Sequence, residues 1–254
     1  MQTERKPGTL PSPEQLLAEQ TSALEAFFGE EALPQPPKEL MEFLERIHDL
    51  GFSFEPYLKR DIVLAQDSEF PGWKVKPNSW LWEQINAGKV SPDAVRLKIG
   101  WAAMETIVRP NYDGGKQLHE NDPLAPILED LRKAGHIVVP DYVEHVPSVS
   151  RFAVSALEVE GPVIARFAQI AKDDGEGIKA PPVCDWNYVG NLAHPEFGKA
   201  DTWEWFSNRF GRDGRLIGGP LHDGGLADVD CHWAGDHDGG IAFRLQKDFP
   251  SNPQ

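Results

Sequence analysis

The chain has 254 residues, of which 40% are hydrophobic and 26% are charged, and its formal net charge is −15 at pH 7. This composition is typical of a globular protein, and the length accommodates one large domain or two small ones. The acidic excess argues against binding to a nucleic-acid backbone or to an anionic membrane surface, because both attract basic proteins. Neutral or cationic ligands, proteins and metal ions are the partners that this charge favours.

The N-terminus reads Met-Gln-Thr-Glu-Arg-Lys-Pro-Gly and lacks the apolar segment of a signal peptide. No apolar run approaches the roughly 20 residues that a membrane span needs. We therefore expect a cytoplasmic protein without membrane insertion, and surface display by another route stays open. The two cysteines, Cys184 and Cys231, form no CxxC pair. We expect free, buried thiols, with a single disulfide as the alternative.

Two helices are predicted near the N-terminus. Ser12-Pro13-Glu14 has the residue types of a helix start, and apolar residues with helical spacing follow as far as Gly29. After a proline-rich linker at 34–37, a second helix is expected over 38–50. We predict that residues 1–60 form an N-terminal helical hairpin region and that residues 61–254 form a second domain.

The middle of the chain is predicted to be mostly helical, with short strands between the helices. Helices are expected at 79–87, 92–104, 126–134 and 158–172, and strands at 61–64 and 137–139. The segment 146–156 contains β-favouring residues, and 109–123 is expected to be a polar loop.

The composition and periodicity of the sequence change after Pro182: glycines become frequent, helical periodicity is lost and aromatic residues cluster. Between residues 227 and 233, apolar and polar residues alternate with period two, which indicates a half-buried strand. Asp228, Asp230 and His232 are expected on its solvent-facing side.

A second alternating segment follows at 241–246, after a turn at 235–239. We expect the two strands to pair as an antiparallel hairpin. Its turn would then place Asp236, His237 and Asp238 beside the polar face of the first strand.

Three short motifs follow one another in this part of the chain: Trp203-Glu204-Trp205, then Arg215 to Gly219, then Gly240 to Leu245. The ordered set resembles the closing signature of the formylglycine-generating enzyme superfamily, which typically shows Asn-Val-Trp-Glu-Trp, Arg-Gly-Gly-Ser and Gly-Phe-Arg segments. This sequence departs from that pattern in having Pro220 where the family has Ser. The resemblance is strongest over 183–245. It implies an α+β protein: a C-type-lectin-like domain with short irregular β-strands, preceded by a mostly helical N-terminal region.

The resemblance has two implications for activity. Enzymes of the superfamily that make formylglycine carry two nearby cysteines that bind copper, but only Cys231 is present in the corresponding segment, so we do not expect that oxidation. The variable proteins of diversity-generating retroelements form a second branch, in which a lectin-like scaffold displays a variable ligand-binding segment. The chain resembles these proteins most closely, which implies a non-enzymatic display protein that binds a protein or cell-surface ligand. Several superfamily members associate, so a homo-oligomer stays open.

In this interpretation the motif residues form a structural frame, and polar residues at about 221–239 face the ligand. The frame comprises Trp203, Glu204, Trp205, Gly218, Gly219, Phe243 and Arg244. The expected surface comprises His222, Asp223, Asp228, Asp230, His232, Asp236, His237 and Asp238.

Two alternatives remain for the same segment. Asp228, Asp230 and His232 share one strand face, and two carboxylates with an imidazole suit a divalent ion such as Fe(II) or Mn(II). The alternative function is therefore a metal-dependent enzyme of the superfamily, although no HxH or HExxH pattern supports it. No other cofactor is predicted. The third interpretation is purely structural, because Asp and Gly are common in turns.

Overall fold

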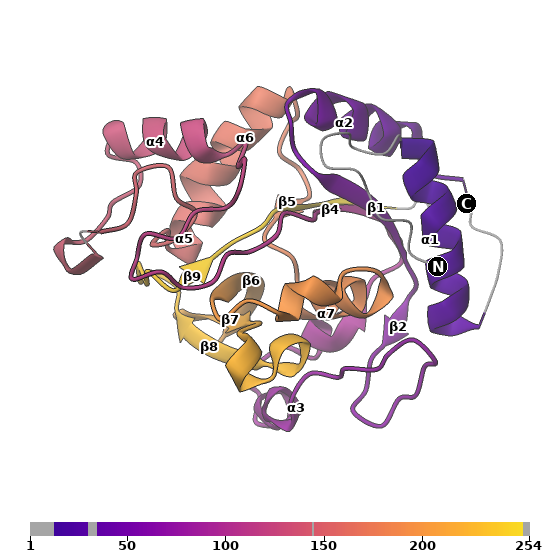
Figure 1. The fold of residues 1–254 in the computed structure, drawn as a ribbon. Coiled ribbons are helices and arrows are strands. Elements are labelled where there is room, and N and C mark those ends of the chain that lie inside the picture. Colours follow the sequence, from indigo (N-terminus) through magenta and orange to yellow (C-terminus); the bar gives the residue numbers. More distant parts are fainter. Residues whose placement is uncertain (1–12, 30–34, 144, 251–254) are drawn as a thin grey trace.

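The computed structural model describes residues 13–29, 35–143 and 145–250. The fold is mixed α+β, as expected, and its strands form two four-stranded sheets and a two-stranded ribbon. Figure 1 shows α1 and α2 together at one side of the molecule, beside β1.

The two predicted N-terminal helices are confirmed as α1 (Pro13–Phe28) and α2 (Lys38–Asp49). Gly29 follows α1 with a φ of +79°, which suits a glycine at a helix end. Apolar residues of α2 are buried, and the ring of Phe43 contacts those of Phe54 and Phe249 with centroids 5.7 Å apart in each pair. The predicted cap Ser12 and the first linker residue, Pro34, lie outside the described residues.

The first sheet has the strand order β1-β4-β10-β5, and all its pairs are antiparallel. Its members are β1 (Phe54–Lys59), β4 (Gly100–Glu105), β10 (Gln246–Pro250) and β5 (Ile178–Lys179). Strands far apart in the sequence, β4 and β10, therefore lie side by side. The predicted boundary at residue 60 falls directly after β1, whose partner β4 lies well beyond it; the division into two domains stays a prediction.

The helix predicted at 92–104 is wrong. The structure has a 3₁₀ turn, η1 (Pro92–Val95), then β3 (Arg96–Leu97), which pairs with β2 (Ile62–Val63), and finally β4. Gly100 has a φ of +139°, which no α-helix accommodates. All residues of β4 are buried, and a strand buried on both faces has an apolar run that periodicity does not distinguish from a helix.

The other predicted helices of this region are confirmed. They are α3 (Ser79–Asn86), α4 (Ala125–Lys133) and a continuous helical segment made of α5 (Ala156–Glu158), η3 (Val159–Val163) and α6 (Ile164–Ala171). Pro162 lies inside η3, which has π-helical hydrogen bonding.

The strand predicted at 137–139 is wrong, because the backbone N–H of Val138 is bound by the side chain of Glu158 instead of a partner strand. No strand forms within 146–156 either, and η2 (Asp141–Val143) is the one 3₁₀ helix between α4 and α5 in the described part of this region.

The C-terminal third contains a helix that the sequence did not indicate, α7 (Val183–Leu192). Its residues from Val183 to Gly190 are all buried. A helix buried on every side has no polar stripe, which explains why its periodicity was not visible. Short 3₁₀ turns follow at η4 (Pro195–Gly198), η5 (Leu221–Asp223) and η6 (Gly225–Ala227).

The second sheet has the strand order β8-β7-β6-β9. Its members are β6 (Trp203–Phe210), β7 (Gly214–Gly218), β8 (Val229–Trp233) and β9 (Ile241–Ala242). The predicted strands β8 and β9 exist, but the predicted hairpin between them is wrong. They lie at opposite edges, where β8 pairs with β7 and β9 pairs in parallel with β6. The chain continues from β9 into β10, so this segment joins the two sheets.

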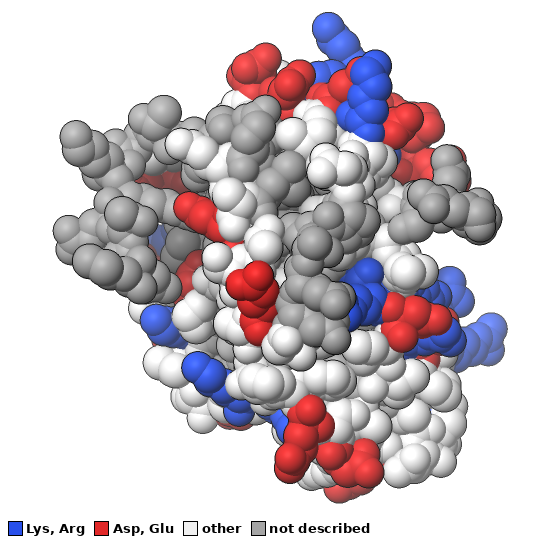
Figure 2. All heavy atoms as spheres, turned by 90° about the vertical axis from the view of Figure 1, so that its right-hand side faces the viewer, with Lys and Arg blue, Asp and Glu red and all other residues white. Residues whose placement is uncertain are grey.

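One core cluster contains buried residues from Leu24 in α1 to Phe249 in β10. No described helix is long and apolar enough to cross a bilayer. On the face shown in Figure 2, the Lys and Arg side chains of the described residues lie among acidic ones and form no continuous basic surface.

Candidate functional site

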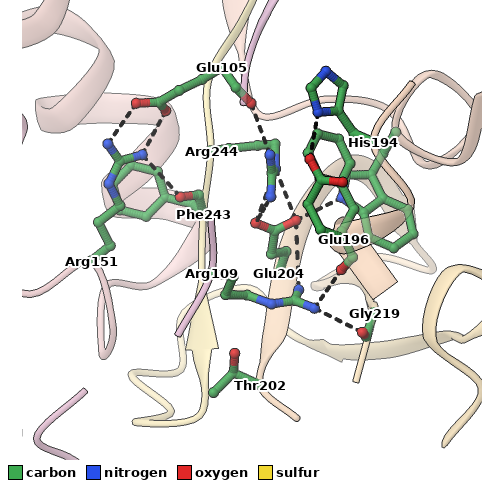
Figure 3. Close-up of polar contacts among 12 residues, drawn as sticks. Glu105, Arg109, Arg151, His194, Glu196, Thr202, Glu204, Gly219, Phe243 and Arg244 are labelled. Atoms are coloured by element: carbon green, nitrogen blue, oxygen red, sulfur yellow. Dashed lines mark hydrogen bonds and ion pairs between the residues drawn. The ribbon is translucent and has the colours of Figure 1, made fainter. Parts of the chain in front are cut away.

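A buried ion pair joins two of the sequence motifs. Arg244 Nη2 lies 2.7 Å from Glu204 Oε1, and both side chains are at most 1% exposed (Figure 3). The indole Nε1 of Trp186 in α7 donates a hydrogen bond of 2.7 Å to Glu204 Oε2. Glu204 therefore ties β6 both to α7 and to the segment between β9 and β10.

Arg109 lies on the other side of the same carboxylate, with Nη1 3.6 Å from Glu204 Oε2. Burial opposes ionisation of Glu204, but the charges of Arg244 and Arg109 outweigh it and lower the pKa of Glu204 to about 2. Glu204 is therefore a carboxylate at neutral pH.

The paired glycines of the second motif have a steric role beside this network. Arg109 Nη2 donates to the carbonyl oxygen of Gly219 at 2.8 Å (Figure 3). A Cβ at Gly219 would lie 2.7 Å from Arg109 Nη1, and one at Gly218 would lie 2.3 Å from the carbonyl oxygen of Asp228. Gly219 also has a φ of +105°, where a side chain is strained. Both positions therefore require glycine.

A second buried ionic cluster lies next to the first. Arg151 Nη1 is 2.6 Å from Glu105 Oε2, and Arg151 Nη2 is 2.6 Å from Asp122 Oδ1. The Arg151 guanidinium lies over the ring of Phe243, with Cζ 5.6 Å from the ring centroid. Arg244 Nη1 donates to the backbone carbonyl of Glu105 at 2.9 Å, which connects the two clusters.

The remaining frame residues flank this network. Trp205 is buried, and its Nε1 donates to the carbonyl oxygen of Val154 at 2.9 Å. Phe243 is fully buried, whereas Trp203 is half-buried. Arg109, Glu105 and Arg151 were missed by the sequence reasoning, because nothing in the local pattern distinguishes a buried charged residue from an exposed one.

A pocket of about 470 Å³ lies over the second sheet, on the face opposite to the buried Glu204–Arg244 ion pair. Its floor contains residues from all four strands of that sheet: Trp203, Ile217, Asp230, Cys231, His232 and Ile241. Tyr112, Asp201, His222, Asp238 and Gly240 complete the lining. Trp203 and Glu204 are neighbours in β6 and point to opposite faces, so the buried ion pair supports the sheet from behind the pocket.

Four of the eight residues expected on the ligand-facing surface line this pocket: His222, Asp230, His232 and Asp238. Asp223 lies beside His222, with Oδ2 3.2 Å from His222 Nε2. His237 is directed to another partner, and its Nε2 is 2.9 Å from Glu158 Oε2.

Asp228 and Trp233 differ from the expected alternation. Asp228 was expected on the solvent-facing side of the strand but is only 6% exposed, whereas Trp233, which the alternation places on the apolar side, is 63% exposed. Asp228 directly follows the turn η6. Burial, together with the charges of Asp223 and Asp230, raises the pKa of Asp228 to about 7.

A group of metal-ligating side chains lies at one edge of the pocket. His232, Asp236 and Asp238 offer ligand atoms within 4.8 Å of one another, and no other such group occurs among the described residues. The trio expected from the sequence, Asp228, Asp230 and His232, does not form such a group, and His232 lies instead with Asp236 and Asp238.

Asp236 is already oriented by other contacts. Its Oδ2 lies 2.7 Å from His232 Nε2, and its Oδ1 accepts a hydrogen bond of 2.8 Å from the Tyr142 hydroxyl. One imidazole and two carboxylates are donors that fit Mn(II) or Fe(II).

Both cysteines are free thiols, and Cys184 is buried while Cys231 is partly buried. Comparison of the chain with protein families, with curated proteins and with solved structures found no match.

Proposed function

We propose that the chain is a non-enzymatic ligand-binding protein with a C-type-lectin-like fold, similar to the variable proteins of diversity-generating retroelements. The binding surface is formed by residues at about 221–239. The observation that carries this proposal is the pocket: its floor crosses the second sheet, and four of the residues expected to face the ligand line it.

The arrangement behind the pocket supports the same function. The Glu204–Arg244 pair and the two glycines lie where side-chain changes are costly, whereas Asp230 and His222 are exposed. A scaffold of this kind presents different polar side chains without reordering when a ligand binds, and this limits the entropic cost of binding. The expected partner is a protein or cell-surface ligand.

The group of His232, Asp236 and Asp238 favours a second candidate function, that of a metal-dependent enzyme. A divalent ion bound there would lie at the edge of the same pocket and would act as a Lewis acid toward a bound substrate. Uptake of such an ion separates this candidate from simple ligand display.

Sequencing of the 3′ end of the gene across a natural population tests the display function. We expect substitutions to accumulate at the codons for residues 221–239, while the codons for Glu204, Gly219 and Arg244 stay constant. If the segment 221–239 varies no more than the rest of the gene, the proposal of a variable display surface is wrong.

A further inference from the structure

We infer that the pocket over the second sheet binds a guanidinium group, presented as an arginine side chain of a protein ligand. This inference rests on the proposed function, since it names the chemistry that the binding surface of this chain recognises. It starts from the charges around the pocket.

Three carboxylates line the pocket, and its lining contains no Lys or Arg among the described residues. Each carboxylate accepts a backbone N–H through Oδ1: Asp201 from Tyr112 at 2.6 Å, Asp230 from Cys231 at 2.8 Å, and Asp238 from Gly240 at 2.6 Å. These bonds fix the carboxylates in place. No Lys or Arg in the described part of the chain forms an ion pair with any of them, so their charge is available to a ligand.

Aromatic side chains are part of the same lining. Tyr112 is 55% exposed, and Trp203 is half-buried on the floor of the pocket. A planar guanidinium stacks on aromatic faces and at the same time donates paired hydrogen bonds to a carboxylate, whereas an ammonium is a compact, strongly hydrated charge. The volume of about 470 Å³ is within the range of about 300–1,000 Å³ that is typical of small-ligand sites.

A buried carboxylate outside the pocket lining, two residues before Asp230 in the chain, adds to this preference. Asp228 is 6% exposed, and its Oδ2 has no hydrogen-bond partner among the described residues. Its backbone is extended and it lies two residues before Asp230, so its side chain is on the same side of the chain as this pocket residue. An unpaired, buried carboxyl oxygen is costly unless the group is protonated or meets a cation.

The charged groups around Asp228 determine how cation binding depends on pH. The carboxylates of Asp223 in η5 and Asp230 in β8 oppose its ionisation, and the guanidinium of Arg109 favours it. A cation in the pocket favours the ionised form of Asp228, and binding near pH 7 is therefore accompanied by proton release.

The test is a titration of the full chain with N-acetyl-arginine amide, followed by ¹H–¹⁵N NMR in buffer containing a metal chelator. The matched probes are N-acetyl-citrulline amide, which has nearly the same shape without the charge, and N-acetyl-lysine amide. We expect saturable shifts at amides of residues 201, 230 and 238 with the arginine probe. Binding of the citrulline probe should be weaker by about tenfold or more, because a neutral urea lacks the charge-assisted hydrogen bonds of a guanidinium.

Variants of the pocket carboxylates sharpen the test. Asp230→Asn and Asp201→Asn should each weaken binding of the arginine probe by about fivefold, the effect of losing one partly exposed charge contact. The matched control is Asp174→Asn, because Asp174 is also an exposed carboxylate that accepts a backbone N–H but lies on a different surface of the protein. It should bind the probe like the unchanged protein. The NMR spectrum of each variant shows directly whether its fold is retained.

The inference is overturned if the citrulline probe binds as tightly as the arginine probe, if no saturable shifts occur, or if the shifts lie away from the pocket. The lysine probe tests the aromatic contribution, since equal affinity for lysine and arginine would contradict recognition of the guanidinium plane. A variable segment 221–239 without arginine binding would remove this inference and leave the proposed function. If the arginine probe binds but the segment 221–239 does not vary, this inference stands and the proposal of a variable display surface is removed.

Discussion

Glu204 in β6 and Arg244 in the segment between β9 and β10 are 40 residues apart in the chain. They form a buried ion pair, with Arg244 Nη2 2.7 Å from Glu204 Oε1. The pair joins the second sheet to the segment that leads into the first. Its removal should therefore affect the whole fold and not only the pocket.

We expect Glu204→Gln to lower the free energy of unfolding by about 3–5 kcal/mol, because it leaves the buried charge of Arg244 without its partner. Chemical denaturation followed by tryptophan fluorescence measures this change. The matched control is Asp61→Asn, which removes an exposed ion pair with Arg96 and should cost less than about 1 kcal/mol. Equal effects of the two substitutions would show that the buried pair does not hold the frame together.

His194 predicts how stability changes in alkaline solution. Burial opposes its protonation, but hydrogen bonds to Glu196 and Glu55 raise the pKa of His194 to about 9. Protonated His194 therefore stabilises the folded protein. This stabilisation is complete below pH 6.5, the ordinary pKa of histidine, and is lost as the pH rises through 9.

We expect His194→Gln to reduce stability by about 2–3 kcal/mol at pH 6 and to have little effect at pH 10. Unfolding measured at both pH values checks this difference. A substitution that costs the same at pH 6 and pH 10 would contradict a charged His194 in the folded protein.

The ionised carboxylate of Asp228 should destabilise the folded protein. Its pKa is raised to about 7, so the folded protein favours the protonated carboxyl, and stability is lost as the pH rises from the ordinary value of 3.8 through 7. Asp228→Asn, which resembles the protonated form, should raise stability by about 2 kcal/mol at pH 8 and by much less at pH 4. Thermal unfolding at the two pH values is the measurement. Destabilisation at pH 8 would show that the ionised carboxylate is needed in the fold.

The metal candidate predicts specific ligands. If His232, Asp236 and Asp238 bind Mn(II), addition of Mn(II) should raise the melting temperature, and His232→Ala or Asp236→Ala should remove the increase. Asp230→Ala is the matched control, since Asp230 is an exposed carboxylate nearby but outside this group; it should keep the response to Mn(II) and change stability by less than about 0.5 kcal/mol. No response of the unchanged protein to Mn(II) or Fe(II) would remove the metal candidate.

Local signals in the sequence were sufficient where an element has one solvent-exposed side. The helices α1, α2 and α3 have apolar stripes and glycines at or near their ends, and they were predicted almost to the residue. The alternation that predicted β8 is also local, but which strand it pairs with depends on distant residues. The hairpin with β9 was therefore wrong.

Buried elements gave misleading signals because their periodicity is lost. Both α7 and β4 are buried on nearly every side, and one was missed while the other was predicted as a helix. The same applies to the site: the motif around Glu204 and Arg244 could be found from the sequence, but Arg109 could not, because its burial is created by the fold. The contact of His232 with Asp236 likewise depends on the path of the chain after β8.

The most direct test of the division into a fixed frame and a tolerant binding surface is a substitution scan of residues 200–245, read out by resistance of each variant to proteolysis. We predict that His222, Asp230 and Asp236 accept most side chains, because the fold does not depend on them, and that Glu204, Gly219 and Arg244 accept almost none. If the positions at 221–239 prove as intolerant as the frame, these residues hold the fold together and the proposal of a displayed binding surface is contradicted.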